Sequence, residues 1–290
     1  MVGMTPQHRL LPAILALAFS VLTFSPASAA PTGKNHVGLQ LYSLRNQFGT
    51  NVSGTLAEIK SWGITNVELA GTYNLTPEKF KAELDARGVN AFSGHFPYDR
   101  LRSDIEGVAK DAQTLGLKYV GCAWIPHGEP FDEKTCRDAI EVFNKAGEAL
   151  AKHGLTFFYH AHGYEFQPHQ DGTLFDLLMR ETNPKFVNFQ MDVFWIVHPG
   201  QDPVKLLEKF GSRWQLMHLK GMRDSTPTGL LTGHSAVTND VAVGTGKIDY
   251  VPILKAGKKV GIKWYVIEDE SPSSESQIPQ SYNYLQTLKW

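Results

Sequence analysis

LTFFYH (155–160) is the first of four apolar runs that each end in a residue able to bind a metal ion, and the others are FVNFQMD (186–192), WQLMH (214–218) and WYVIE (264–268). Each run has the length and apolar character of a buried β-strand, and the gaps leave room for a loop and a helix. In a closed β/α barrel the C-terminal ends of the strands surround one mouth. The residues expected to meet there are His160, Asp192, His218 and Glu268.

These four strand ends predict one metal site. Imidazole nitrogens combined with carboxylate oxygens suit a divalent ion such as Mn²⁺, Zn²⁺, Co²⁺ or Fe²⁺, with Mn²⁺ as the first choice. Asp192 is interpreted as a ligand rather than as a helix cap, because Asp202 before Pro203 is the better cap. The alternative is four unrelated polar strand ends at the surface.

The same alternation of apolar runs and amphipathic stretches continues along the chain. Four earlier strands are expected at 37–43, 66–70, 90–95 and 118–124, and helices at 53–62, 76–88, 100–116, 133–154, 173–181, 202–210, 249–261 and 273–289. Eight strand–helix units favour an α/β fold of the (β/α)8 TIM-barrel type. An open doubly wound sheet would normally carry a Gly-rich phosphate loop after its first strand, where this chain has YSLRNQF (42–48).

Helix caps and a proline mark several of these boundaries. Ser53 and Thr76 are expected to begin their helices, with Pro77 in the first position of the second one. Pro279 limits where the last helix can begin.

The N-terminus predicts export. Arg9 precedes the apolar run LLPAILALAFSVLTF (11–25), and ASA (27–29) fits a cleavage site. The run has about 15 residues, fewer than the roughly 20 that a spanning helix needs. The expected organisation is a signal peptide at 1–29 and one barrel domain at 30–290, which places the mature protein in the periplasm of a Gram-negative cell or otherwise outside the cell.

Composition excludes several classes of partner. The net charge is −1 and the charged residues are interspersed, which argues against nucleic acid and anionic membranes. A small carbohydrate is the expected partner, without stable membrane insertion, and the sequence does not indicate an oligomeric state. Cys122 and Cys136 are expected to be two separate thiols rather than a disulfide.

Further side chains near the predicted mouth are candidate catalytic groups. His162 shares a strand face with His160, and Lys220 shares one with His218. His160 is the preferred ligand, His162 a group that binds substrate or supports the ligand, and Glu165 an acid/base or orienting carboxylate. Glu268 could serve as both ligand and base, and Lys220 could hold a developing oxyanion.

Substrate-binding candidates come from both halves of the chain. Glu68 and His95 end the second and third predicted strands, and Trp124 ends the fourth. Trp195 offers a face on which a sugar could stack, although core packing is the default role of an aromatic side chain. His198 could bind substrate or be a solvated loop residue.

Together these motifs resemble the sugar isomerase/epimerase superfamily with a xylose-isomerase-like TIM barrel. The resemblance covers nearly all of 37–289 and rests on ITNVELAG (64–71), SGHFP (93–97), HAHGYEF (160–166), MDVFW (191–195), MHLKG (217–221), GTGKIDY (244–250) and YVIEDE (265–270). It implies a divalent metal held by Glu, Asp, His and Glu at strands five to eight. Asp192, His218 and Glu268 match the last three, whereas His160 replaces the first Glu and Gly221 stands where relatives often carry Asp.

The resemblance implies an enzyme that removes a proton next to the carbonyl of a carbohydrate and passes through a metal-stabilised enediolate. Isomerisation or epimerisation is the first expectation. Because His160 replaces one of two paired Glu bases, β-elimination by a 3-keto-glycoside lyase or hydrolase is the alternative. A non-catalytic sugar-binding barrel is an alternative of another class. Export and the lack of an Arg/Lys cluster favour non-phosphorylated substrates, and charge balance and export argue against the family's endonuclease branch.

Overall fold

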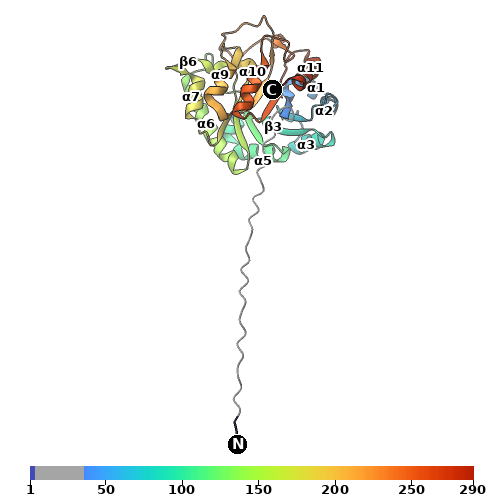
Figure 1. Cartoon of the computed structure of the whole chain (residues 1–290), viewed down its shortest axis with the longest axis vertical. Helices are drawn as coiled ribbons and strands as arrows, with labels where there is room; N and C mark the ends of the chain where they lie inside the picture. The colour runs from blue at the N-terminus through green and yellow to red at the C-terminus, as the bar shows by residue number, and fades with distance from the viewer. Residues whose placement is uncertain (4–35) are drawn as a thin grey trace. The chain divides into compact units, whose positions relative to one another are not determined.

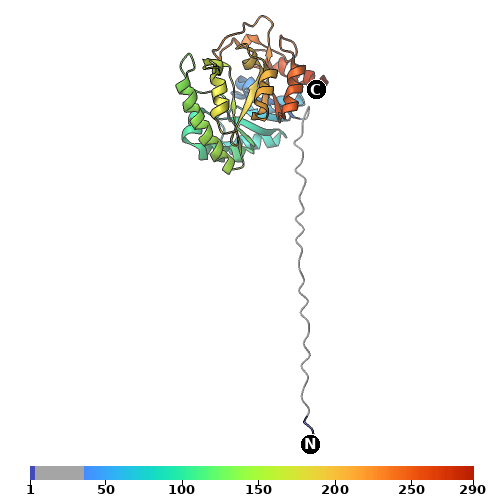
Figure 2. The same ribbon diagram turned by 60° about the vertical axis from the view of Figure 1, so that its left-hand side comes forward.

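The computed structural model describes residues 1–3 and 36–290, so the apolar run and cleavage site of the predicted signal peptide lie outside the described residues. Residues 36–290 contain a closed barrel of parallel strands in the order β1-β12-β9-β8-β5-β4-β3-β2. Helices surround these strands (Figures 1 and 2). The predicted (β/α)8 TIM barrel is confirmed.

The strands of the barrel agree closely with the apolar runs. They are β1 (Val37–Gln40), β2 (Asn66–Leu69), β3 (Asn90–His95), β4 (Tyr119–Cys122), β5 (Thr156–His160), β8 (Val187–Asp192), β9 (Trp214–Leu219) and β12 (Trp264–Ile267). β1 pairs with β12, which closes the barrel. The N-terminal elements, in blue, therefore lie beside the C-terminal helix α11, in red (Figure 1).

The outer layer consists of helices between the strands. They are α1 (Arg45–Phe48), α2 (Val52–Ser61), α3 (Pro77–Ala86), α4 (Tyr98–Ser103), α5 (Ile105–Leu115), α6 (Glu133–Lys152), α7 (Leu174–Glu181), α8 (Val193–Val197), α9 (Pro203–Phe210), α10 (Tyr250–Val260) and α11 (Ser274–Thr287). Thr76 and Asp202 cap α3 and α9 as predicted, each with a proline in the first turn.

Several predicted boundaries are wrong for local reasons. The first strand stops at Gln40, whose side chain accepts a hydrogen bond from the amide of Tyr42 and turns the chain into a 3-10 helix. The expected helix at 100–116 is two helices, because Asp104 leaves the helical conformation. Asn51 rather than Ser53 caps α2. Pro279 lies inside α11, which begins five residues earlier at Ser274.

Apolar side chains fill the barrel interior below its C-terminal mouth. Phe92, Tyr119, Phe158, Leu216 and Val266 form this cluster, and Trp264 packs against it. Phe158, Leu216 and Val266 each lie two residues before a polar residue at the end of the same strand, so both share the inward face. The apolar cluster therefore supports the polar side chains at the C-terminal mouth from below.

A small hairpin at the mouth consists of β10 (Gly221–Met222) and β11 (Asp240–Val241). A Cβ atom on residue 221 would clash with the carbonyl oxygen of Val241, which explains why glycine stands there. The hairpin brings Asp240 back to the barrel. A second short hairpin pairs β6 (Pro168–His169) with β7 (Gly172–Thr173).

The cysteines do not pair. Cys122 and Cys136 are both buried free thiols, as expected. Within the part of the chain that the structure describes, no helix has the length and apolar character to cross a membrane.

Candidate metal centre

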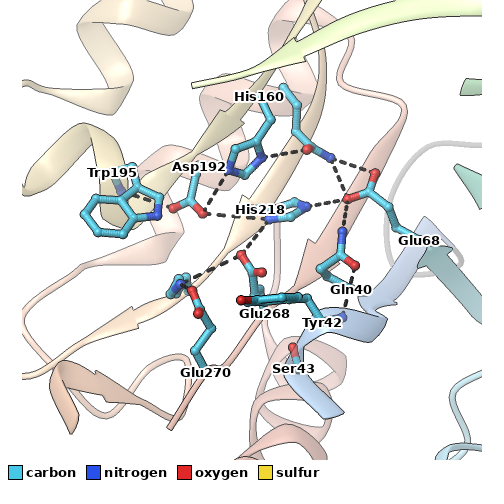
Figure 3. A network of polar contacts seen from close by, with 12 residues as sticks. Gln40, Tyr42, Ser43, Glu68, His160, Asp192, Trp195, His218, Glu268 and Glu270 are labelled. Carbon is cyan, nitrogen blue, oxygen red and sulfur yellow. Dashed lines mark hydrogen bonds and ion pairs between the residues drawn. The ribbon is translucent and has the colours of Figure 1, made fainter. Parts of the chain in front are cut away.

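His218 lies at the centre of the polar cluster, between Glu68 on one side and Asp192 and Glu268 on the other (Figure 3). Its Nδ1 is 3.0 Å from Oε2 of Glu268 and 3.7 Å from Oδ2 of Asp192. These three residues offer ligand atoms that all lie within 4.8 Å of one another. Nε2 of His160 is also 3.7 Å from Oδ2 of Asp192, so the four predicted residues meet at one place.

Asp192 has a buried oxygen without a hydrogen-bond partner that lies beside the other candidate ligands. Its Oδ1 accepts a hydrogen bond from the amide of Trp195 at 3.1 Å and caps α8. The sequence interpretation that Asp192 is not a helix cap is therefore wrong. Oδ2 of Asp192 is buried and has no hydrogen-bond partner among the described residues. A buried carboxylate oxygen without a donor is costly, so a cation fits here. The residues present can hold a divalent ion.

Glu68 lies on the opposite side of His218 and is fully satisfied. Hydrogen bonds reach its carboxylate from Gln40 at 2.9 Å, Ser93 at 2.6 Å, Gln190 at 3.0 and 3.2 Å and His218 at 2.6 Å. The side chain is completely buried and is not part of the pocket lining. Glu68 lies beneath the histidines, so its position gives no support to the prediction that it binds substrate.

Charge pairing sets the protonation of the cluster. Burial would raise the pKa of Glu68, but His95 and His218 hold it well below its usual value. Burial would lower the pKa of His218, but Glu68 and Glu268 raise it to about 10. His218 is therefore a cation between two carboxylates when no metal is bound.

The two carboxylates at the mouth differ. Burial raises the pKa of Asp192 to about 7, although Lys220 and His218 act in the opposite direction. Burial would also raise the pKa of Glu268, but Lys220 and His218 lower it. The same two cations therefore outweigh burial at Glu268, which also has a hydrogen bond from His218, but not at Asp192.

Lys220 is a buried cation at the mouth. It forms an ion pair with Glu270 and lies 3.6 Å from Asp240 and 3.9 Å from Glu268. Burial would lower the pKa of Lys220, but these carboxylates raise it well above its usual value. The ammonium also lies over the ring of Trp195, 5.6 Å from its centroid. Lys220 is therefore held charged at the edge of the site.

The mouth opens into a cavity of about 560 Å³. Its lining includes Gln40, Tyr42, His95, Phe96, Tyr98, Asp99, Trp124, Pro126, His160, His162, Trp195, Lys220, His234, Ser235, Asp240, Glu268 and Glu270. The predicted site residues His95, Trp124, His162, Trp195, Lys220 and Glu268 therefore all face one pocket.

Two other predicted residues do not reach this pocket. Glu165 is completely buried, and its carboxylate accepts hydrogen bonds from the hydroxyl of Tyr159 and the amide of His162. It orients the backbone beneath His162 and is not placed for acid–base chemistry on a substrate. His198 is 2% exposed and stacks on Phe194, and it does not line the pocket. The positions of Glu165 and His198 give no support to their predicted roles as a catalytic and a substrate-binding residue.

Comparisons with known proteins agree with this architecture. Residues 56–290 match the family model described as xylose isomerase-like TIM barrel. The chain belongs to this family. An inosose dehydratase of Geobacillus kaustophilus is 25% identical over 270 residues, covering 81% of this chain and 84% of that protein.

Solved structures superpose on most of this chain. A sugar phosphate isomerase/epimerase from Parabacteroides distasonis matches with a TM-score of 0.70 and 25% identity, covering 90% of this chain and 96% of that one. The IOLI protein with a bound zinc atom matches with a TM-score of 0.66 and 16% identity, covering 87% and 96%. The relatives include a lyase and an isomerase/epimerase, which confirms the expected enzyme class at the level of the family.

The sequence interpretation missed several polar residues that lie beside or beneath the candidate ligands. Gln190 and Asp192 share one face of β8, and Ser93 and His95 share one face of β3, so strand parity could have found Gln190 and Ser93. Gln40 is the last residue of β1, as His160 and Asp192 are the last residues of β5 and β8. Asp240 follows a long loop, and nothing in the sequence pattern could have placed it at the mouth.

Proposed function

We propose that the chain is an exported, divalent-metal-dependent carbohydrate lyase, which removes a proton next to a carbonyl and then expels a β-substituent. The observation that carries the metal site is the unpartnered Oδ2 of Asp192, which faces the ring nitrogens of His160 and His218. The zinc atom of the IOLI structure supports a metal, and the dehydratase name of the Geobacillus relative supports elimination.

His160, Asp192, His218 and Glu268 would hold the ion. When bound, a divalent cation polarises a substrate carbonyl and holds a neighbouring hydroxyl as a Lewis acid. The histidine at 160 suits this role because burial, together with His218, lowers its pKa well below the usual value and leaves the ring neutral. Mn²⁺ is our first choice, with Zn²⁺, Co²⁺ and Fe²⁺ as the other candidates.

The chain's own residues at the mouth would move the protons. Glu268 is ionised and lines the pocket, so it can accept the proton next to the carbonyl. The ammonium of Lys220 faces the same space and would stabilise negative charge that develops on a substrate oxygen. His162 lines the pocket between Trp124 and Trp195, and burial lowers its pKa to about 3, so it is a neutral hydrogen-bonding group for substrate.

Asp240 is our candidate for the acid that protonates the leaving group. It lines the pocket 3.6 Å from Lys220, and burial raises its pKa to about 7. A carboxyl group with a pKa near the working pH can donate a proton and then be reprotonated from solvent. One base and one different acid suit elimination, whereas two-base epimerisation needs paired bases on opposite faces of the substrate.

The pocket's charge favours a non-phosphorylated substrate. Of the described residues that line it, Lys220 is the one lysine or arginine, and Asp240, Glu268 and Glu270 surround it. A phosphate dianion would meet these carboxylates without the Arg or Lys partners that usually bind it.

The pocket's size favours a substrate larger than one sugar ring. Its volume of about 560 Å³ lies in the range of sites for drug-sized ligands. Phe96, Tyr98, Trp124 and Pro126 make part of its wall apolar. A 3-keto-glycoside, with its aglycone against this wall, matches both features. Isomerisation or epimerisation of a keto-sugar is the second candidate, supported by the Parabacteroides structure.

The deciding experiment incubates Mn²⁺-loaded protein with 3-keto-glycosides and keto-sugars in D₂O. Release of aglycone together with an unsaturated keto-sugar supports the lyase, and Asp192→Asn should abolish it. Deuterium incorporation without elimination would favour the isomerase/epimerase. Neither exchange nor product over the panel, with sugar still bound, would leave the non-catalytic barrel.

Export is part of the proposal and has its own test. Expression of the full chain in a Gram-negative host should yield periplasmic protein. The mass of that protein should match cleavage after Ala29. A cytoplasmic, uncleaved product would contradict it.

A further inference from the structure

We infer that Glu68 sets the tautomers of both candidate metal-binding histidines, His218 directly and His160 through the amide of Gln190. Glu68 is then a positioning residue that prepares the site without touching the metal or the substrate. The inference rests on the metal site of the proposed function, but not on the reaction or the sugar.

His218 faces Glu68 with Nε2, at 2.6 Å from Oε1. An ionised carboxylate can only accept hydrogen bonds, so Nε2 must carry the hydrogen. Nδ1 lies on the other side of the ring, toward Asp192 and Glu268. Nδ1 also faces a carboxylate and carries a hydrogen in the metal-free protein. A cation bound between Asp192 and Glu268 would displace that hydrogen, because Nε2 keeps its own toward Glu68.

Gln190 links Glu68 to His160 and so determines which ring nitrogen of His160 carries the hydrogen. Its Nε2 donates to both oxygens of Glu68, at 3.2 and 3.0 Å, so its carbonyl oxygen must point the other way. That oxygen lies 2.7 Å from Nδ1 of His160. Because a carbonyl only accepts, Nδ1 carries the hydrogen and Nε2 is left with its lone pair toward Asp192. His160 and Gln190 are register partners on β5 and β8, which fixes their approach.

The carboxylate of Glu68 is held in one orientation by donors on the neighbouring strands. Gln40 and Ser93 donate to its two oxygens, and both residues are its register partners on the neighbouring strands β1 and β3. Nε2 of His95 lies 3.2 Å from Oε1 of Glu68 and 3.1 Å from the carbonyl oxygen of Gln190. Donors from four strands other than its own therefore surround one acceptor-only group, which determines the direction of every hydrogen bond in the network.

The arrangement suits a histidine at position 160. A carboxylate there would face the carbonyl oxygen of Gln190 without a hydrogen between them. An imidazole supplies that hydrogen on Nδ1 and still offers a ligand nitrogen on Nε2. Second-shell groups that orient histidine ligands in this way typically contribute about 10–100-fold to metal affinity.

Glu68→Gln tests the inference with almost no change in shape. Glutamine has one carbonyl where glutamate has two acceptor oxygens, so its NH₂ group must face either His218 or Gln190. Either His218 loses its acceptor, or Gln190 turns over and presents NH₂ to His160. We expect ¹⁵N spectra of the metal-stripped protein to show a tautomer or protonation change in at least one of these histidines. Titration with Mn²⁺ or Zn²⁺ should show about 10–100-fold weaker binding.

Three further variants separate positioning from packing. Gln190→Met removes the amide at similar length, so it should change the tautomer of His160, leave that of His218 and weaken metal binding. Ser93→Ala removes a donor to Glu68 without touching a histidine. Glu165→Gln changes another fully buried carboxylate outside the network. The last two should bind metal within about threefold of wild type, since neither changes a group that contacts His160 or His218.

Unchanged histidine tautomers in both Glu68→Gln and Gln190→Met would overturn the inference, as would equal weakening of binding in all four variants. If Glu68→Gln does not fold, Gln190→Met decides. Wild-type protein that binds neither Mn²⁺ nor Zn²⁺ would remove the proposed metal site. The tautomer of His160 in the metal-stripped protein would then still decide whether the network acts as described.

Discussion

The two sides of His218 are built differently. On the side of Glu68, every oxygen of the carboxylate has donors from the protein, and no atom of the residue reaches solvent. On the side of the mouth, Oδ2 of Asp192 has no partner among the described residues, and its pKa is raised to about 7 by burial. One side is complete as protein alone, and the other leaves a buried carboxylate oxygen that a cation would satisfy.

This difference separates support from function. Buried polar groups that serve the fold are normally satisfied, as Glu68 is. A buried polar atom left without a partner needs a reason, and at Asp192 the neighbouring imidazole and carboxylate atoms supply one. Changes on the mouth side should therefore lower metal affinity and activity directly, without affecting the fold. Changes on the side of Glu68 should affect metal affinity only indirectly, through the histidines.

The largest effect is expected from Asp192→Asn. Asparagine still caps α8, so the free energy of unfolding of the metal-free protein should stay within about 1 kcal/mol of wild type. Metal affinity should fall by more than about 100-fold, beyond the range for residues that only support a ligand. Metal content and chemical denaturation measure the two quantities.

A matched control for this change is Asp202→Asn. Asp202 caps α9 as Asp192 caps α8, but it lies away from the cluster. It should keep full metal content. Loss of metal in both variants, or in neither, would contradict the distinction between cap and ligand.

The next effect contrasts Glu268 with Glu270, which lies two residues further along the chain. Glu268→Gln removes a candidate ligand next to His218 and should lower metal affinity by about 100-fold. Glu270→Gln removes an ion pair with Lys220, which keeps Asp240 and Glu268 as partners. Its metal affinity should change by less than about threefold, while KM rises moderately. Similar metal loss in both variants would show that net charge, not coordination, holds the ion.

Metal affinity should rise with pH. Between pH 6 and 8 a cation must displace a proton from His218, whose pKa is raised to about 10. Below about pH 7 it must also displace one from Asp192, whose pKa is raised to about 7. Metal binding then releases protons, and affinity should increase roughly tenfold per pH unit for each proton displaced. Calorimetric titrations between pH 6 and 8 in buffers of different ionisation enthalpy measure both quantities. The pKa of Glu68 is lowered, so that side contributes no change in this range. Affinity independent of pH would contradict the assigned protonation.

The smallest effect should come from Ser93→Ala on the complete side. Glu68 loses one of several donors, so the free energy of unfolding should fall by about 1 kcal/mol. Thermal or chemical denaturation measures this loss. A collapse of stability would mean that the network cannot lose a single member.

The sequence allowed prediction of the barrel and of the strand ends that meet at its mouth. Apolar runs ending in His160, Asp192, His218 and Glu268 were sufficient because parallel strands bring their C-terminal ends to one mouth. The role of Glu68 could not be predicted from its position at a strand end alone. Whether a side chain binds substrate or lies beneath the ligands depends on its height in the barrel, and the register shift between β2 and β3 affects that height.

Other errors come from local competition. The short apolar stretch of α8 resembles a continuing strand, and only the capping bond of Asp192 turns it into a helix. Glu165 follows His162 closely in sequence, but the turn at Gly163 directs its carboxylate toward Tyr159. Both outcomes depend on single hydrogen bonds that a periodicity pattern does not contain.

The double use of Asp192 restricts how this position can evolve. One oxygen caps α8, and the other faces the candidate ion site. Serine, threonine and asparagine could replace it as helix caps, but none of them brings a negative charge. A lineage released from selection for catalysis could therefore accept any of these three at position 192 and keep the barrel. The residue found there in a homologue should distinguish descendants that still perform chemistry from those that only retain the fold.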